Sequence, residues 1–118
     1  MAFAWTPTFH RYSAEARQTS MIYAGVEEPM YAEVSIGYKD FMLPAGTKFS
    51  ITFSKVGQAD QVFHFVTPKD VIYVPTNPAA GNIQIPFKWT PPVAGRYQVD
   101  TRNDAGVVID RMTKTVRE

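Results

Sequence analysis

The sequence predicts an all-β fold, an antiparallel β-sandwich or barrel that follows an extended N-terminal arm. From about Met30 onward, apolar and polar residues alternate with period two, which is typical of half-buried strands. Clusters of Gly, Pro, Asn and Asp interrupt this alternation at short intervals, as in sandwiches built from many short strands. The chain has 118 residues, the size of one domain. We therefore expect an aromatic arm over residues 1–25 and a β-sandwich over residues 26–118.

Alternation defines the expected strands one after another. In residues 48–54, KFSITFS, the large apolar side chains fall on one face and the small polar ones on the other. In residues 82–89, NIQIPFKW, the apolar face ends in Trp89, which we interpret as a core residue. Pro86 cannot donate a ladder hydrogen bond, so this strand is expected at the edge of a sheet. Further strands are expected at residues 61–66, 71–74, 96–102 and 107–114.

Two segments are harder to interpret. The run of Val107, Val108 and Ile109 fits two registers, so alternation leaves open whether Val108 or Ile109 faces the core. Ahead of the strands, the segment SAEARQT at residues 13–19 is rich in helix formers. With Ser13 as N-cap it predicts one or two helical turns, the only helix that the sequence indicates.

Composition excludes several classes of function. The net charge is +1, and the twelve Lys and Arg residues are spread along the chain, so we expect no nucleic-acid or anionic-membrane partner. There is no cysteine, which excludes thiol catalysis, thiolate metal sites and disulfides. No window has the length or apolarity of a signal peptide or a membrane helix. We expect a soluble protein that stays where it is made unless an assembly carries it out.

Residues suited to acid–base chemistry are few and scattered. His10 lies in the aromatic arm, and His64 lies in the middle of an expected strand. No second histidine or carboxylate stands at ligand spacing beside His64, so we interpret it as an ordinary strand residue. Glu27 and Glu28 are adjacent, and on an extended chain adjacent side chains point apart. We therefore expect no enzyme activity and no cofactor.

A calcium site is the remaining metal hypothesis. Asp100, Asn103 and Asp104 offer three oxygen ligands within five residues. Asn and Asp are also favoured in turns, because they tolerate unusual φ angles and hydrogen-bond the local backbone. Without the spacing of an EF-hand loop, we interpret them as a hairpin turn and expect no metal site.

The segment Trp89-Thr-Pro-Pro-Val-Ala-Gly95-Arg-Tyr97 predicts a corner between two strands. Its prolines would stiffen the connection, and Gly95 would adopt the backbone conformation that the corner requires. Asn-Asp-Ala-Gly106 would then close a hairpin between the last two strands, with Gly106 at positive φ.

This corner resembles the E-to-F corner of immunoglobulin-like sandwiches, in which a tyrosine hydroxyl turns back onto the corner backbone. The resemblance is to the immunoglobulin-like domains of bacterial surface proteins and bacteriophage virions, and it covers about residues 33–115. It implies an immunoglobulin-like antiparallel β-sandwich, with Tyr97 in the role of the corner tyrosine. The chain departs from antibody domains by lacking the inter-sheet cysteine pair, and Trp89 precedes strand F rather than lying on strand C.

The arm supplies the candidate partner interface. Four large aromatic residues occur there without strand or helix periodicity, and each has roughly 150–250 Å² of surface that favours burial. Either the arm covers an open edge of its own sandwich, or it docks onto a neighbouring subunit. The candidate interface residues are Phe3, Trp5, Phe9 and Tyr12, with Tyr73 in a later loop as a secondary contact.

These observations, with the resemblance, lead to a functional expectation. We expect a structural virion protein, a phage capsid decoration (cement) protein or a head or tail accessory component, made in the host cytoplasm and located in the virion. Its partner would be the major capsid protein or another virion protein, with a homo-oligomer also possible. The alternative is a carbohydrate- or cell-surface-binding module, which would recruit exposed aromatic residues.

Overall fold

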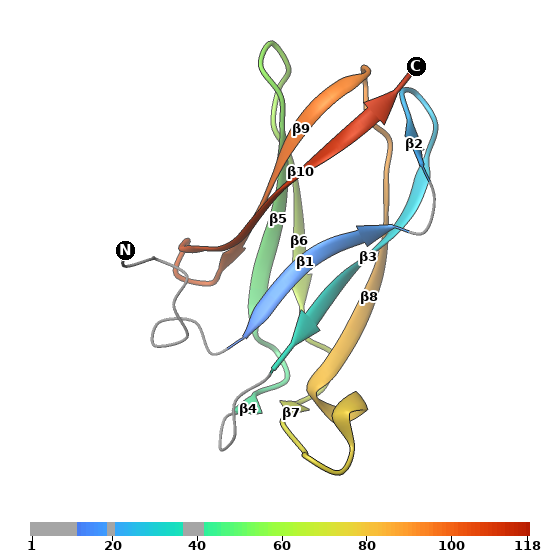
Figure 1. The fold of residues 1–118 in the computed structure, drawn as a ribbon. Coiled ribbons are helices and arrows are strands. Elements are labelled where there is room, and N and C mark those ends of the chain that lie inside the picture. The colour runs from blue at the N-terminus through green and yellow to red at the C-terminus, as the bar shows by residue number, and fades with distance from the viewer. Residues whose placement is uncertain (1–11, 19–20, 37–41) are drawn as a thin grey trace, which may run out of the picture.

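Two β-sheets pack face to face in the computed structural model, which describes residues 12–18, 21–36 and 42–118 (Figure 1). The smaller sheet has the order β1-β3-β8, and the larger has the order β2-β10-β9-β5-β6. Neighbouring strands are antiparallel except for the short parallel pair of β2 with β10. The all-β sandwich predicted from the sequence is confirmed. The strands of the two sheets are β1 (Ser13–Gln18), β2 (Ile22–Tyr23), β3 (Glu28–Ser35), β5 (Lys48–Ser54), β6 (Gln61–Val66), β8 (Asn82–Trp89), β9 (Gly95–Asn103) and β10 (Val108–Arg117).

A small two-stranded sheet closes one end of the sandwich, at the bottom of Figure 1. It pairs β4 (Met42–Leu43) with β7 (Val71–Ile72), and a 3₁₀ turn, η1 (Pro78–Gly81), follows it before β8. Leu43 and Val71 are buried, so this sheet extends the core at that end. The strand expected at residues 71–74 is therefore only two residues long.

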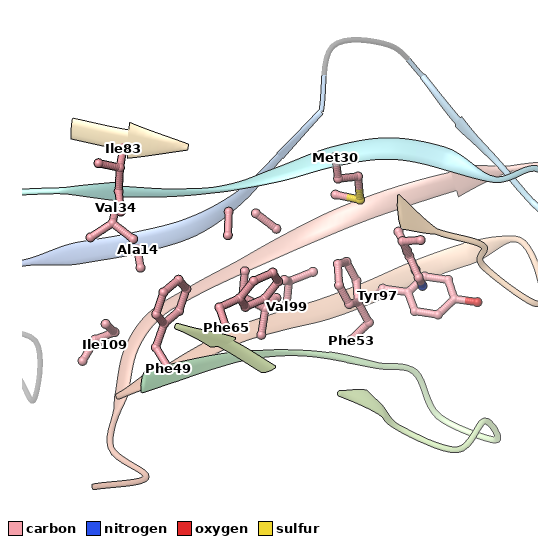
Figure 2. Close-up of a cluster of buried hydrophobic side chains, with 14 of the residues drawn as sticks. Ala14, Met30, Val34, Phe49, Phe53, Phe65, Ile83, Tyr97, Val99 and Ile109 are labelled. Carbon is pink, nitrogen blue, oxygen red and sulfur yellow. The ribbon is translucent and has the colours of Figure 1, made fainter. Parts of the chain in front are cut away.

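The core fills the space between the sheets with the side chains that alternation assigns to it (Figure 2). Phe49, Ile51 and Phe53 of β5 point inward and are at most 3% exposed. The ring of Phe53 stacks on Trp89, with centroids 4.0 Å apart, so the interpretation of Trp89 as a core residue is confirmed. Burying each such side chain contributes roughly 1.5–3 kcal/mol.

Pro86, which has no N–H group to donate, lies in an edge strand. Strand β8 pairs only with β3 among the described strands, and Pro86 lies opposite Tyr31 in that ladder. The prediction of an edge strand is confirmed.

The expected helix at residues 13–19 is wrong, because Ser13–Gln18 form strand β1. This strand pairs with β3, and its two alanines, Ala14 and Ala16, are buried against the larger sheet. An isolated helix of two turns is marginal in water, so burial and a full ladder outweigh the helix propensity of alanine. Part of the arm expected at residues 1–25 therefore belongs to the sandwich, because β1 is a strand of the smaller sheet and β2 a strand of the larger.

A β-bulge decides the register that the sequence leaves open. The pairing of β10 with β9 shifts between Val108 and Asp110, and Ile109 turns into the core at 4% exposure. Because the bulge inserts one residue, Asp110 also lies on the inward side, opposite Thr101. The bulge thus places a carboxylate between the sheets.

Candidate interaction site

The corner around Tyr97 has the geometry that the resemblance implies. The Tyr97 hydroxyl donates a hydrogen bond to the carbonyl of Val93 at 2.7 Å. The backbone N–H of Val93 in turn donates to the Tyr97 hydroxyl oxygen at 3.3 Å. Gly95 has φ of 134° and Gly106 has φ of 82°, both in the region that favours glycine. Trp89 packs edge-on against Tyr97, with ring centroids 5.1 Å apart. These residues hold the connection from β8 to β9 and form part of the core rather than an exposed site.

The predicted interface residues fall into two groups. Phe3, Trp5 and Phe9 lie outside the described residues, as does His10. Tyr12 and Tyr73 are half-buried, and both pack against the core of the sandwich. Burial raises the pKa of the Tyr12 hydroxyl, and the negative charge of Asp104 raises it further. Tyr12 and Tyr73 thus contact their own domain.

Strand β6 forms an open edge of the larger sheet in the described part of the chain. Just after β6, Thr67 donates its backbone N–H to the carbonyl of Thr47 at 2.9 Å, toward the β5 side. Backbone groups alternate sides along an antiparallel strand, so the odd-numbered residues of β6 also bond β5. The residues that direct N–H and C=O groups to the free edge are Val62, His64 and Val66.

This edge lacks the features that usually protect one. Natural sheets block edge pairing with Pro, Lys and other charged side chains, or with very short strands. Strand β8 has Pro86 and Lys88, β1 has Glu15 and Arg17, and β2 has two residues. Strand β6 has six residues, Gln-Val-Phe-His-Phe-Val, and its outward side chains Val62 and Val66 are 48% and 52% exposed. Of the described sheet edges, β6 is therefore the one best suited to accept another strand.

A hollow of about 240 Å³ lies next to this edge, on the outer face of the larger sheet. His64, Ser50 and Arg102 line it from three neighbouring strands, because Ser50 lies opposite His64 in one ladder and opposite Arg102 in the next. Lys48 borders it from β5, and the β9–β10 hairpin closes it with Asp104. A second hollow, of about 270 Å³ beside Pro68 and Lys69, is lined by Asn82 and presents a single cation.

An ion cluster stands beside the first hollow. Arg111 holds both carboxylate oxygens of Asp100, at 2.8 and 3.1 Å, and this contact raises the pKa of the Arg111 guanidinium. Arg102 reaches the same carboxylate only at 3.5 Å. Asp100 is 5% exposed, and its charge is already satisfied by the two contacts with Arg111.

Two of the three oxygen residues of the calcium hypothesis have separate roles in this geometry. Asp100 pairs with Arg111, and Asn103 Oδ1 accepts hydrogen bonds from the backbone N–H groups of Ala105 and Val107, both at 3.0 Å. Asn103 thus forms the turn predicted for it. Among the described residues, no three His, Asp or Glu side chains gather to hold a metal ion. Within the same residues, no helix is long and apolar enough to cross a membrane.

A polar pair lies between the sheets where β1 passes over β10. Lys114 donates to Gln18 Oε1 at 2.6 Å, and burial lowers the pKa of its ammonium group. Asp110 Oδ2 is buried without a hydrogen-bond partner among the described residues, and burial followed by the charge of Glu15 raises the pKa of this carboxyl group. Burial therefore makes the charged form of each group less favourable in the folded protein.

Sequence reasoning missed the hollow. Alternation predicts that Lys48, Ser50 and His64 face away from the core, because each adjoins an inward Phe or Ile. It does not predict that β9 lies beside β5, which brings Arg102 to the same place. The strand order is a tertiary property, so the cluster has no sequence motif.

No protein-family model and no curated protein matches the sequence. Among solved structures, the solution structure of the CARDB domain of PF1109 from Pyrococcus furiosus is similar, with 12% identity, a TM-score of 0.51, and coverage of 91% of this chain and 94% of that chain. A crystal structure of that domain in complex with di-metal ions is 11% identical, with a TM-score of 0.51 and coverage of 89% and 86%. At these identities the likeness concerns architecture. The chain is similar to the CARDB domain only in its fold, a small β-sandwich.

Proposed function

We propose that this chain is a structural, non-enzymatic protein of a bacteriophage virion. In this proposal it is a capsid decoration protein, or a head or tail accessory component, that stabilises an assembly through protein–protein contacts. The virion part is supported by the sequence resemblance of the Trp89–Tyr97 corner. The contact part is supported by the open edge of β6, which is the observation on which the proposed mechanism depends.

The mechanism is strand addition. An extended segment of the major capsid protein, or of another virion protein, lies along β6 and bonds the free N–H and C=O groups of Val62, His64 and Val66. The exposed side chains of Val62 and Val66 lose water on contact, which adds a hydrophobic contribution. Many copies on one shell turn a modest contact into a stable attachment.

The aromatic residues Phe3, Trp5 and Phe9 are a second proposed contact, from the N-terminal segment. The chain enters the described sandwich at Tyr12, which packs against the core. A partner bound to the preceding residues would therefore be joined to a fixed point of the fold. The two contacts are separable by experiment, because β6 and Tyr12, which precedes β1, lie in different parts of the chain.

The test is incorporation into phage particles, measured by quantitative mass spectrometry of purified virions from the organism that encodes the chain. Val62→Pro removes an N–H group at the free edge and leaves the ladder to β5 intact, since proline is tolerated where the N–H faces solvent. We expect it to weaken attachment by about 1–3 kcal/mol, roughly five- to 150-fold. Val62→Thr is the matched control, because it keeps both the N–H group and the β-branched shape.

The outcomes are distinct. Absence of the wild-type chain from every purified particle refutes the virion proposal. Presence of the chain with equal incorporation of Val62→Pro and Val62→Thr refutes strand addition at β6 and leaves the N-terminal contact to be tested. Hydrogen exchange gives an independent readout, because the amides of Val62, His64 and Val66 should become protected on assembly.

The alternative, a carbohydrate- or cell-surface-binding module, requires an exposed aromatic platform. Trp89 is fully buried and donates its indole N–H to Gln61 at 2.9 Å, so it is not available as one. Tyr73 is half-buried. Neither of the two aromatic residues considered for this role is an exposed platform, which supports the assembly proposal over this alternative.

A further inference from the structure

The hollow on the outer face of the larger sheet presents more positive than negative charge. Lys48 and Arg102 line it, and His64 adds a third nitrogen group that is positive when protonated. Asp104, on the β9–β10 hairpin, is the one carboxylate among its lining residues. Ser50 lies between His64 and Arg102 and adds a hydroxyl donor.

The cations of the hollow are not satisfied by the described part of the protein. Lys48 forms no ion pair with any described residue, and Arg102 has only the 3.5 Å contact with a carboxylate that Arg111 already holds at 2.8 Å. An arginine forms its strongest contacts as two parallel N–H···O bonds to one carboxylate or phosphate. Arg102 therefore retains donors for an incoming anion.

The outer face of the smaller sheet is the opposite case. There Arg17 stands between two carboxylates, with Nε 2.7 Å from Glu15 and 2.7 Å from Glu33. One cation shared by two carboxylates leaves negative charge in excess, so this cluster has no unmet demand for an anion. It provides an internal control for the effect of removing an arginine.

We propose that the hollow lined by Lys48, Ser50, His64 and Arg102 binds an anionic oxygen group of the size of a carboxylate or a phosphate. The volume of about 240 Å³ accommodates such a group together with ordered water. Lys48 and Arg102 supply charge from two strands, and Ser50 supplies a neutral donor. Asn103 also lines the hollow; its Oδ1 is engaged in the turn, and its side-chain N–H groups donate to no described residue. This site does not require strand addition, so it stands or falls independently of the proposed function.

Asp104 provides a test in the opposite direction to Arg102. Its negative charge opposes an anion in the hollow, and the same charge adds to the effect of burial in raising the pKa of Tyr12. Removing this charge should tighten anion binding, while removing Arg102 should weaken it. A merely structural role of either residue would not produce opposite effects of this kind.

The experiment is a ¹H–¹⁵N NMR titration of the full chain with inorganic phosphate and, separately, with acetate, at constant ionic strength set by sodium chloride. We expect saturable shifts of the Lys48, Ser50 and Arg102 amides, with affinity roughly in the millimolar range. Arg102→Gln should weaken binding about fivefold or more, and Asp104→Asn should tighten it by about two- to fivefold. Arg17→Gln should leave binding unchanged.

Each outcome decides something. Saturation by phosphate alone assigns the site to phosphate-type groups, saturation by acetate alone assigns it to carboxylates such as those of acidic protein segments, and saturation by both supports the shared chemistry. Absence of saturable shifts with either probe overturns the proposal, as does equal loss of binding in Arg17→Gln and Arg102→Gln. Asp104→Asn lies in an exposed turn, so it remains informative if Arg102→Gln does not fold.

Discussion

The hydroxyl of Tyr97 should contribute measurably to the stability of the sandwich. Tyr97 is 1% exposed, and its hydroxyl both donates to the carbonyl of Val93 at 2.7 Å and lies 3.3 Å from its N–H. Tyr97→Phe keeps the ring and its contact with Trp89 but removes both polar contacts. The backbone of Val93 then loses the partner that fixes the corner.

The size of the effect follows from the groups that are left behind. Leaving buried polar groups without a partner costs about 1–3 kcal/mol, and Val93 is only half-buried, so water lowers the cost toward the smaller value. We expect Tyr97→Phe to lower the free energy of unfolding by about 1–2 kcal/mol. For a domain of this size that corresponds to a fall in Tm of roughly 3–10 °C.

The assay is urea unfolding followed by Trp fluorescence, with a thermal melt as a second measurement. Tyr23→Phe is the matched control, because Tyr23 is exposed and, among the described residues, its hydroxyl reaches only the Met21 sulfur at 3.9 Å. That control should stay within about 0.5 kcal/mol of wild type. If Tyr97→Phe falls in the same range, the hydroxyl does not hold the corner and the tyrosine-corner interpretation is refuted.

Two further predictions concern backbone strain and pH. Gly95→Ala should destabilise more than Gly106→Ala in urea unfolding. Gly106 has φ of 82°, which an L-residue adopts at a cost of roughly 1–2 kcal/mol, whereas φ of 134° at Gly95 lies outside the left-handed region open to other residues. A Cβ at Gly95 would also require the flexible end of the Lys55 side chain to move, whereas a Cβ at Gly106 has open space. Equal losses would contradict this. Burial raises the pKa of the Asp110 carboxyl group, so the native state binds this proton more tightly than the unfolded chain does. The free energy of unfolding therefore falls as pH rises from the ordinary aspartate pKa toward the raised native value. Asp110→Asn should therefore stabilise the protein at neutral pH and lose that advantage in acid; a pH-independent difference would disprove the account.

Much of the fold could be predicted from local pattern. The inward face of β5, the edge position of β8 and the core role of Trp89 all follow from alternation and from the chemistry of proline. The helix expected at residues 13–19 failed because Ala14 and Ala16 are good helix formers whose small size also suits a strand packed closely on the other sheet. Local propensity could not weigh that packing, since it depends on residues far along the chain.

The candidate sites could be predicted from the sequence to a much smaller extent. The open edge of β6 depends on which strand ends the sheet, and the hollow depends on β9 lying beside β5 rather than beside β8, its predecessor in sequence. His64, Ser50 and Arg102 could each be assigned to a strand from the sequence, but that these strands lie side by side could not be predicted.

By itself the sequence determined the class of fold, the faces of most strands and the corner at Tyr97, because these depend on side chains within a few residues of each other. Only the tertiary structure decided the order of the strands, the inward turn of Ile109 at the bulge, and the meeting of Lys48, His64 and Arg102. Strand order is set by burial summed over both sheets, a long-range quantity. The open edge and the charged hollow therefore became visible only once the sheets were assembled.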